Sequence, residues 1–256
     1  MQKFTDVIME FVNKMGYLSS KDIEGIIFYG SNQNGFGNQF SDIDLHIIFN
    51  NNLEEEIRGS ALINGIRIEY FEKRLESMYS KTLNEFKNQG NAVVSMIVYG
   101  DIILDKNGKI KTLQDYIKAI HSLPMPCLSE EEAKEQLAII NNFFDDLKNL
   151  IEQNDIYANH AYHLALERIK DFYFSYYGLP GVSRTKALKT MLNDDYRHAI
   201  KKENPPAEFI ELYLSCLDEN QTLPNKLISL ERLYNYSTRE IDFDKYNHRI
   251  VLSKKR

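Results

Sequence analysis

The segment IIFYGSNQNGFGNQFSDIDL, residues 26–45, joins two apolar runs through a connection rich in glycine and asparagine. Residues 26–29 and the run that begins at Ile43 are rich in β-branched and aromatic side chains, which favour strands. Gly30-Ser31 follows the first run directly, and this pair of small residues is typical of a turn. The segment therefore predicts a strand, a tight turn and a second strand.

The second predicted strand carries acidic residues at alternating positions. Successive side chains of a strand point to opposite faces, so Asp42, Asp44 and His46 share one face and the apolar residues between them share the buried one. Two carboxylates this close repel each other, and a divalent cation between them removes the conflict. Because hard oxygen ligands suit magnesium, the pattern predicts a Mg²⁺ site at Asp42 and Asp44. We interpret His46 as a packed or exposed histidine outside this site.

Three residues around the connection are suited to holding a phosphate group. Gly30 has no side chain and lets the backbone approach a ligand closely, while the hydroxyl of Ser31 and nearby amides can donate hydrogen bonds to phosphate oxygens. Ser41, directly before the second strand, is placed to hold the loop through a side-chain-to-backbone hydrogen bond. We therefore predict that Gly30, Ser31 and Ser41 form a phosphate-binding turn.

A third carboxylate is available on another predicted strand. Glu69 lies between Ile68 and Tyr70, so its side chain points away from the apolar face of that strand. Glu72 is the alternative acid, but it has the opposite strand parity. The pattern therefore favours Glu69 as the third acidic group of the site.

The periodicity along the chain changes after Gly108. The part before it contains predicted strands at residues 26–29, 43–49, 66–71 and 93–99, a candidate fifth strand at 102–104, and helices at 4–15 and 73–87. The part after it shows only helical periodicity, at residues 112–121, 130–153, 157–177, 183–193, 206–217 and 225–236. Pro124 and Pro126 interrupt the pattern, and Ser129 before three glutamates is typical of a helix start. We therefore predict an α+β protein, with a mixed sheet and flanking helices at residues 1–123 and an all-helical bundle domain at residues 124–256.

Composition and charge exclude several classes of protein. A chain of 256 residues is long enough for two domains of about 150 residues or fewer. Its net charge of -6 argues against a nucleic-acid-binding surface over the whole molecule, and two distant cysteines argue against a disulfide framework or a zinc site. The N-terminal residues lack the plan of a signal peptide, and no apolar run approaches the roughly 18 residues of a membrane span. A cytoplasmic protein is expected.

Residues 30–44, GSNQNGFGNQFSDID, resemble the GS-x3-G and SDID motif of the nucleotidyltransferase superfamily, which includes DNA polymerase beta, the CCA-adding enzymes and the antibiotic nucleotidyltransferases. The resemblance implies that Asp42 and Asp44 bind the magnesium ions that carry a nucleoside triphosphate. It implies that Glu69 completes the metal site or acts as the catalytic base. The phosphate-binding turn takes the family's nucleotide-binding role.

The order of an α/β part and a helical part is similar to the antibiotic-modifying branch, especially the streptomycin and spectinomycin adenylyltransferases. In that branch the third carboxylate is the catalytic base, which is the role implied for Glu69. The helical half of that branch also has segments similar to residues 162–168 and 183–191. Many relatives have a basic residue where this chain has Asn34, which puts one triphosphate contact in question.

The resemblance implies a magnesium-dependent transfer of a nucleoside monophosphate, AMP from ATP, to a hydroxyl group of a small molecule such as an aminoglycoside or lincosamide antibiotic. Pyrophosphate would leave, the helical domain would bind the acceptor, and the protein would form a homodimer. Two alternatives stay open at this point. One is a toxin-like or regulatory nucleotidyltransferase that acts on a protein or a tRNA, although the net acidity disfavours tRNA. The other is a non-catalytic nucleotide- or partner-binding module.

Overall fold

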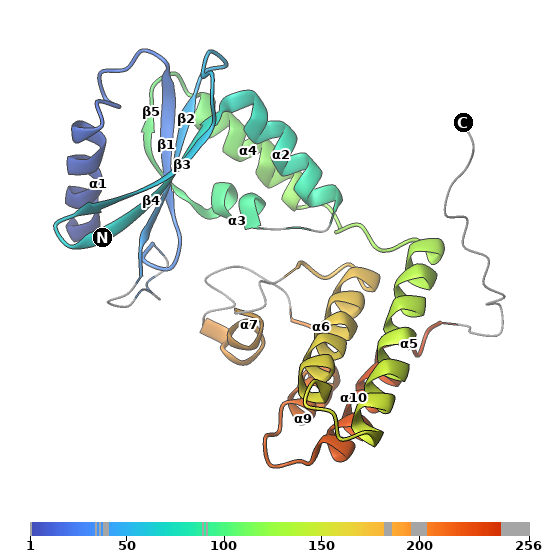
Figure 1. Ribbon diagram of the computed structural model, residues 1–256. Coiled ribbons are helices and arrows are strands. Elements are labelled where there is room, and N and C mark those ends of the chain that lie inside the picture. Colours follow the sequence, from blue (N-terminus) through green and yellow to red (C-terminus); the bar gives the residue numbers. More distant parts are fainter. Residues whose placement is uncertain are drawn as a thin grey trace. The chain divides into compact units, whose positions relative to one another are not determined.

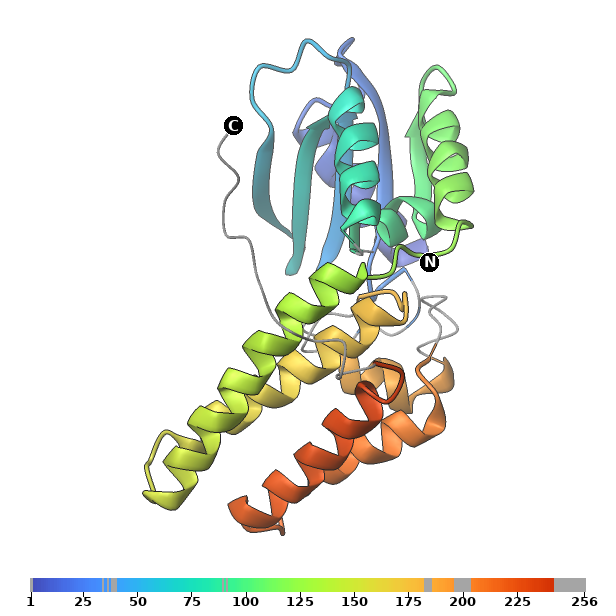
Figure 2. The same ribbon diagram turned by 90° about the vertical axis from the view of Figure 1, so that its right-hand side faces the viewer.

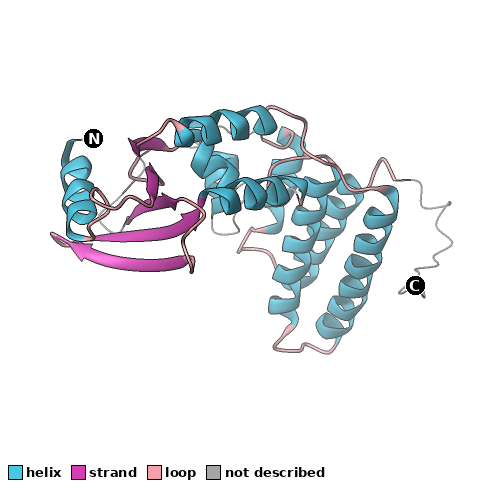
Figure 3. Cartoon of the chain, turned by 90° about the horizontal axis from the view of Figure 1, so that it is seen from above, coloured by secondary structure: helices cyan, strands magenta, loops and turns pink. Residues whose placement is uncertain are grey.

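The computed structural model describes residues 2–33, 35, 37, 41–88, 90, 92–181, 186–195 and 204–241. The chain divides into two compact units, one built from residues 1–125 with 193–202 and the other from residues 126–192 with 203–256. Among the described residues the strands all belong to the first unit, as the magenta ribbons of Figure 3 show. The predicted fold class is confirmed, because a mixed sheet with flanking helices precedes a helical region.

The first unit is built around a five-stranded sheet (Figure 1). Its elements are α1 (Gln2–Lys14), β1 (Ile23–Tyr29), β2 (Ile43–Phe49), β3 (Ile57–Ile63), β4 (Ile66–Arg74), α2 (Leu75–Lys87), α3 (Ala92–Tyr99), β5 (Asp101–Asp105) and α4 (Lys109–His121). The strand order is β3-β4-β2-β1-β5. The pairing of β2 with β4 is parallel and the other pairings are antiparallel. This parallel pair places the start of β2 beside the start of β4.

Helices cover both faces of the sheet (Figure 1). They do so because the central strands carry apolar side chains on both of their faces. On one face, Ile8 and Phe11 of α1 pack in a cluster with Ile43 and the other odd-numbered apolar residues of β2. On the other face, residues such as Ile48 pack in a cluster with buried side chains of α2, α3 and α4. The two layers of helix bury the middle of the sheet.

The segment 93–99 forms α3, so the predicted strand there is wrong. A short apolar run does not by itself distinguish a strand from a buried helix. Two tertiary contacts favour the helix here. The carboxylate of Glu85 accepts hydrogen bonds from the backbone N–H groups of Ala92 and Val94, at 3.0 and 2.9 Å, which supplies partners for the free amides of the first turn. Three apolar side chains at helical spacing then enter the core, namely Val94, Ile97 and Val98.

Strand β3 was not predicted from the sequence, although it completes an edge of the sheet. It pairs with β4 through a hairpin whose turn residues, Asn64 and Gly65, both have positive φ. Asn-Gly is a strong sequence signal for such a turn. The strand itself is mostly exposed and has an irregular mixture of polar and apolar residues, which explains why its periodicity gives little signal. The candidate fifth strand at 102–104 is confirmed as β5.

The described part of the second unit contains helices and no strand. They are α5 (Glu130–Glu152), α6 (Ala158–Tyr176), α7 (Ala187–Leu192), α9 (Ala207–Cys216) and α10 (Leu223–Ser237). Helix α5 begins at the predicted position, where Ser129 and Glu132 form a capping box. In Figure 2, α5 in green lies along α6 in yellow, and α10 in red lies beside α9, in agreement with the contacts between these elements.

Aromatic residues of α6 form much of the core of the second unit. Tyr162, Phe172 and Tyr173 are almost completely buried, and the ring of Tyr173 stacks on Phe209 of α9 with 4.0 Å between centroids. Tyr157, just before α6, is 65% exposed.

Within the described residues, none of the helices has the length and apolar character needed to cross a bilayer.

Candidate metal and nucleotide site

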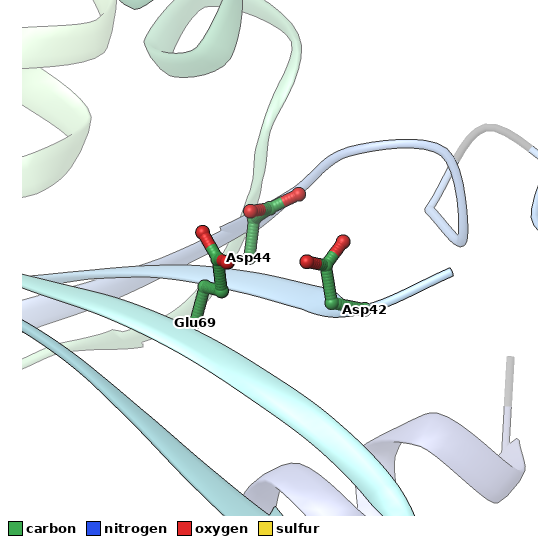
Figure 4. Close-up of side chains that lie close together, drawn as sticks. All are labelled: Asp42, Asp44 and Glu69. Atoms are coloured by element: carbon green, nitrogen blue, oxygen red, sulfur yellow. The ribbon is translucent and has the colours of Figure 1, made fainter. Parts of the chain in front are cut away.

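Three carboxylates meet at the polar end of the sheet in the first unit. Asp42 lies just before β2, Asp44 lies within β2, and Glu69 lies within β4. One oxygen of each can be chosen so that all three oxygens lie within 4.8 Å of one another, and all three side chains are half-buried. Figure 4 shows them pointing toward a common point above the two strands. The structure therefore brings together the three acids singled out in the sequence.

The local geometry of the strands explains this arrangement. Asp42 and Asp44 are two residues apart and so lie on the same face of β2. The parallel register pairs Asp44 directly with Glu69, which places that carboxylate on the same face of the neighbouring strand. Glu72 does not join the cluster, because it accepts a hydrogen bond from the hydroxyl of Tyr17 on the other side of the sheet.

Gly30 allows the backbone of the turn to approach the carboxylates. Its φ is +105°, a value that residues with a side chain rarely adopt, and a Cβ atom built on it would lie only 2.4 Å from Oδ2 of Asp44. Ser31 follows as a half-buried turn residue. The predicted phosphate-binding turn is thus in contact with the acidic cluster through Gly30.

Two amide side chains that were not singled out in the sequence hold this turn in place. Asn32 donates from Nδ2 to the backbone carbonyl groups of Ser41 and Asp42, at 3.2 and 2.7 Å, and so ties the turn to the start of β2. Gln33 donates from Nε2 to the carbonyl of Tyr99 at 2.8 Å. Asn34, where relatives have a basic residue, lies outside the described residues. The sequence signal for Asn32 was its place after Gly30-Ser31, where a side-chain amide can replace a backbone hydrogen bond.

Two arginines contact the carboxylates, Arg58 from the edge strand β3 and Arg67 from β4, and they too were missed in the sequence. Nη2 of Arg67 lies 2.8 Å from Oδ2 of Asp42 and 3.8 Å from Oε1 of Glu69, while Nη2 of Arg58 lies 3.0 Å from Oε2 of Glu69. Arg67 and Glu69 are two residues apart on one strand, so their side chains lie on the same face, and this proximity could have been predicted from the sequence. Arg58 belongs to β3, the strand that was not predicted.

His46 shares the face of the aspartates but packs deeper in the sheet. It is buried, and its ring stacks on Tyr29 with 5.0 Å between centroids. Burial, with smaller effects of two nearby lysines, lowers the pKa of His46 to about 4, so the ring is neutral at pH 7. Burial and the carboxylates of Asp44 and Glu69 raise the pKa of Tyr29 above its usual value. Both rings are uncharged at pH 7, and Tyr29 is the neighbour of Asp44 on the adjacent strand β1.

The arrangement can hold a divalent cation. Three carboxylates from two adjacent strands supply the hard oxygen ligands that Mg²⁺ and similar ions prefer. The absence of a side chain on Gly30 lets the turn lie directly against the carboxylate of Asp44.

A family model and a solved structure are similar to this chain. A family model described as "Nucleotidyltransferase domain" matches residues 8–145, which contain all three acids. No curated protein matches the sequence. The chain is also similar to the crystal structure of a nucleotidyltransferase-like protein from Exiguobacterium sibiricum 255-15, with 17% sequence identity, a TM-score of 0.47, and coverage of 96% of this chain and 81% of that chain.

Proposed function

This chain belongs to the nucleotidyltransferase domain family, and on that premise we propose that it transfers AMP from ATP to a hydroxyl group of a small molecule, with Mg²⁺ held by Asp42 and Asp44 and with Glu69 as the catalytic base. Family membership makes the chain a transferase that uses a nucleoside triphosphate, and it argues against a non-catalytic binding module. The observation that carries the proposed site is the meeting of three carboxylate oxygens within 4.8 Å beside a glycine turn.

In the proposed reaction, the acceptor oxygen forms a bond to the α-phosphorus of the nucleotide while the bond between that phosphorus and the pyrophosphate oxygen breaks. Asp42 and Asp44 would hold the cation, which when bound neutralises charge on the phosphates. Glu69 would take the proton of the acceptor hydroxyl. Gly30, Ser31 and Ser41 would hold phosphate oxygens close to the backbone of the turn. Helices of the second unit would bind the acceptor, for which we propose an aminoglycoside or lincosamide.

Release of pyrophosphate tests this proposal directly. Each nucleoside triphosphate would be incubated with Mg²⁺ and, separately, aminoglycosides, lincosamides, bulk tRNA, a protein extract or no acceptor. Asp44→Asn removes one charge of the site with almost no change in shape. Asp115→Asn is the matched control, since that aspartate is an exposed partner of Lys111 on α4.

We expect pyrophosphate release that depends on one class of small acceptor and is lost in Asp44→Asn but kept in Asp115→Asn. Release only with tRNA or protein would replace the small-molecule acceptor with a macromolecular one. Equal release by the wild type and Asp44→Asn would contradict the proposed site.

A further inference from the structure

Two largely exposed arginine side chains form ion pairs with carboxylates of the acidic cluster. The side chains of Arg58 and Arg67 are 69% and 59% exposed, whereas those of Asp42 and Glu69 are 24% and 20% exposed. The acids are therefore held by the strands, and the arginines are the outer partners. Ion pairs with exposed partners contribute little to stability and are readily exchanged.

The two arginines differ in how they are anchored. Arg58 pairs with Glu69, and its guanidinium also lies over the ring of Phe71, 5.2 Å from the centroid. Arg67 bridges two of the acids, with its shorter contact, 2.8 Å, to Oδ2 of Asp42. Since Arg67 pairs with Asp42, a carboxylate that the cation would use, the guanidinium and the cation compete for that group.

We propose that Arg67 has two alternating sets of partners: it pairs with Asp42 and Glu69 when no cation is bound, and it contacts the phosphates of the nucleoside triphosphate once a cation binds to Asp42. This inference rests on the proposed function of the site. A guanidinium is as well suited to phosphate as to carboxylate, because its planar fork donates two parallel hydrogen bonds to either group. Arg67 precedes Ile68, which is paired with Ile43 at the start of β2, so it lies at the end of the sheet where the glycine turn meets the acids.

Such an exchange couples the cation to the nucleotide. A cation that binds alone must displace Arg67 and therefore binds weakly. A cation that binds together with a triphosphate displaces Arg67 from the carboxylates, but the negatively charged phosphates then replace them as its partners. Arg67 is then a positioning and binding residue for the nucleotide, and it also protects the acidic cluster from mutual repulsion when the site holds no cation.

Arg67→Gln tests the proposal because its two expected effects have opposite signs. Mn²⁺ binding to the free protein, followed by electron paramagnetic resonance, should become tighter by up to about fivefold, since one exposed ion pair no longer competes. Binding of a non-hydrolysable ATP analogue with Mg²⁺, followed by calorimetry, should become about tenfold weaker, because a charged hydrogen-bond donor to phosphate is lost. Arg67→Lys keeps the charge without the fork and should restore the analogue affinity only in part.

Lys111→Gln is the matched control for loss of one positive charge, since Lys111 pairs with Asp115 on the exposed face of α4. It should change neither affinity. Weaker binding of both probes by Arg67→Gln, or no change in either, would overturn the exchange while leaving the proposed function in place, provided that the wild type still binds Mn²⁺ and Asp44→Asn does not. Absence of Mn²⁺ binding by the wild type would overturn both.

Discussion

Replacing Gly30 with alanine should separate the geometry of the acidic cluster from the stability of the fold. The added Cβ would lie 2.4 Å from Oδ2 of Asp44, while ordinary contacts begin at 3.4 Å. The carboxylate must therefore move by about 1 Å, which far exceeds the tolerance of roughly 0.2 Å within which a metal ligand keeps its place. Rotation of the Asp44 side chain relieves the contact at little energetic cost, but it takes that oxygen out of the cluster.

The backbone also resists this substitution. At a φ of +105° an alanine is strained by about 1–3 kcal/mol, which should appear as a lower free energy of unfolding. The effect on the site should be larger in relative terms, because a misplacement of this size costs roughly 100-fold in activity. We therefore expect Gly30→Ala to fold, to melt at a lower temperature, and to lose most of its Mn²⁺ affinity and pyrophosphate release.

Gly108→Ala provides the control for strain alone. Gly108 also has a positive φ, +73°, but a Cβ there would meet nothing within 4 Å, and it lies before α4 away from the acids. Urea denaturation and Mn²⁺ titration of both variants complete the assay. Wild-type Mn²⁺ affinity in Gly30→Ala, or an equal loss of affinity in Gly108→Ala, would show that the contact between the added Cβ and Asp44 does not set the geometry of the acidic cluster.

Three further substitutions have distinct expected outcomes. Glu69→Gln should lower the transfer rate by 100-fold or more, on the order expected for loss of a general base, while Mn²⁺ affinity in a direct titration stays within a few-fold. For Glu56, burial alone raises the pKa, but hydrogen bonds and ion pairs with two lysines and Ser77 lower it from 4.5 to about 2. Its ionised form therefore stabilises the fold above pH 4.5, and this contribution is lost as the pH falls toward 2. Glu56→Gln should reduce the free energy of unfolding at pH 7 by about 2 kcal/mol and should make that free energy fall less steeply in acid. Urea denaturation at several pH values measures both effects. Tyr162→Phe removes a buried hydrogen bond of 2.8 Å to the carbonyl of Cys216 and should cost about 1–3 kcal/mol in denaturant unfolding, with Mn²⁺ binding unchanged.

Each of these outcomes can fail in a specific way. Equal losses of Mn²⁺ affinity and rate in Glu69→Gln would make Glu69 a metal ligand in place of a base. An unchanged acid profile in Glu56→Gln would show that its ion pairs, with a side chain 12% exposed, are screened by water. Loss of Mn²⁺ binding in Tyr162→Phe would mean that the second unit controls the acidic site.

The acidic site follows from the sequence to a large extent. The alternation of a strand places Asp42 and Asp44 on one face whatever the rest of the fold does, and the parity of Glu69 places it away from the apolar face of its own strand. The capping box at Ser129 is equally local, since its partner is three residues away. Such features depend on neighbours in the chain, so they can be predicted from residue order.

Only the tertiary structure decided which strands stand side by side and what surrounds the acids. The parallel register of β2 with β4 makes Asp44 and Glu69 neighbours, and this pairing cannot be predicted from the residues of either strand alone. The capping of α3 by Glu85 turns an apolar run into a helix through a contact from a different helix. Arg58 reaches the site from an edge strand with little periodicity of its own. In each case contacts between residues distant in sequence contribute more free energy than the local preference of the segment for helix or strand, so the tertiary contacts determine the structure.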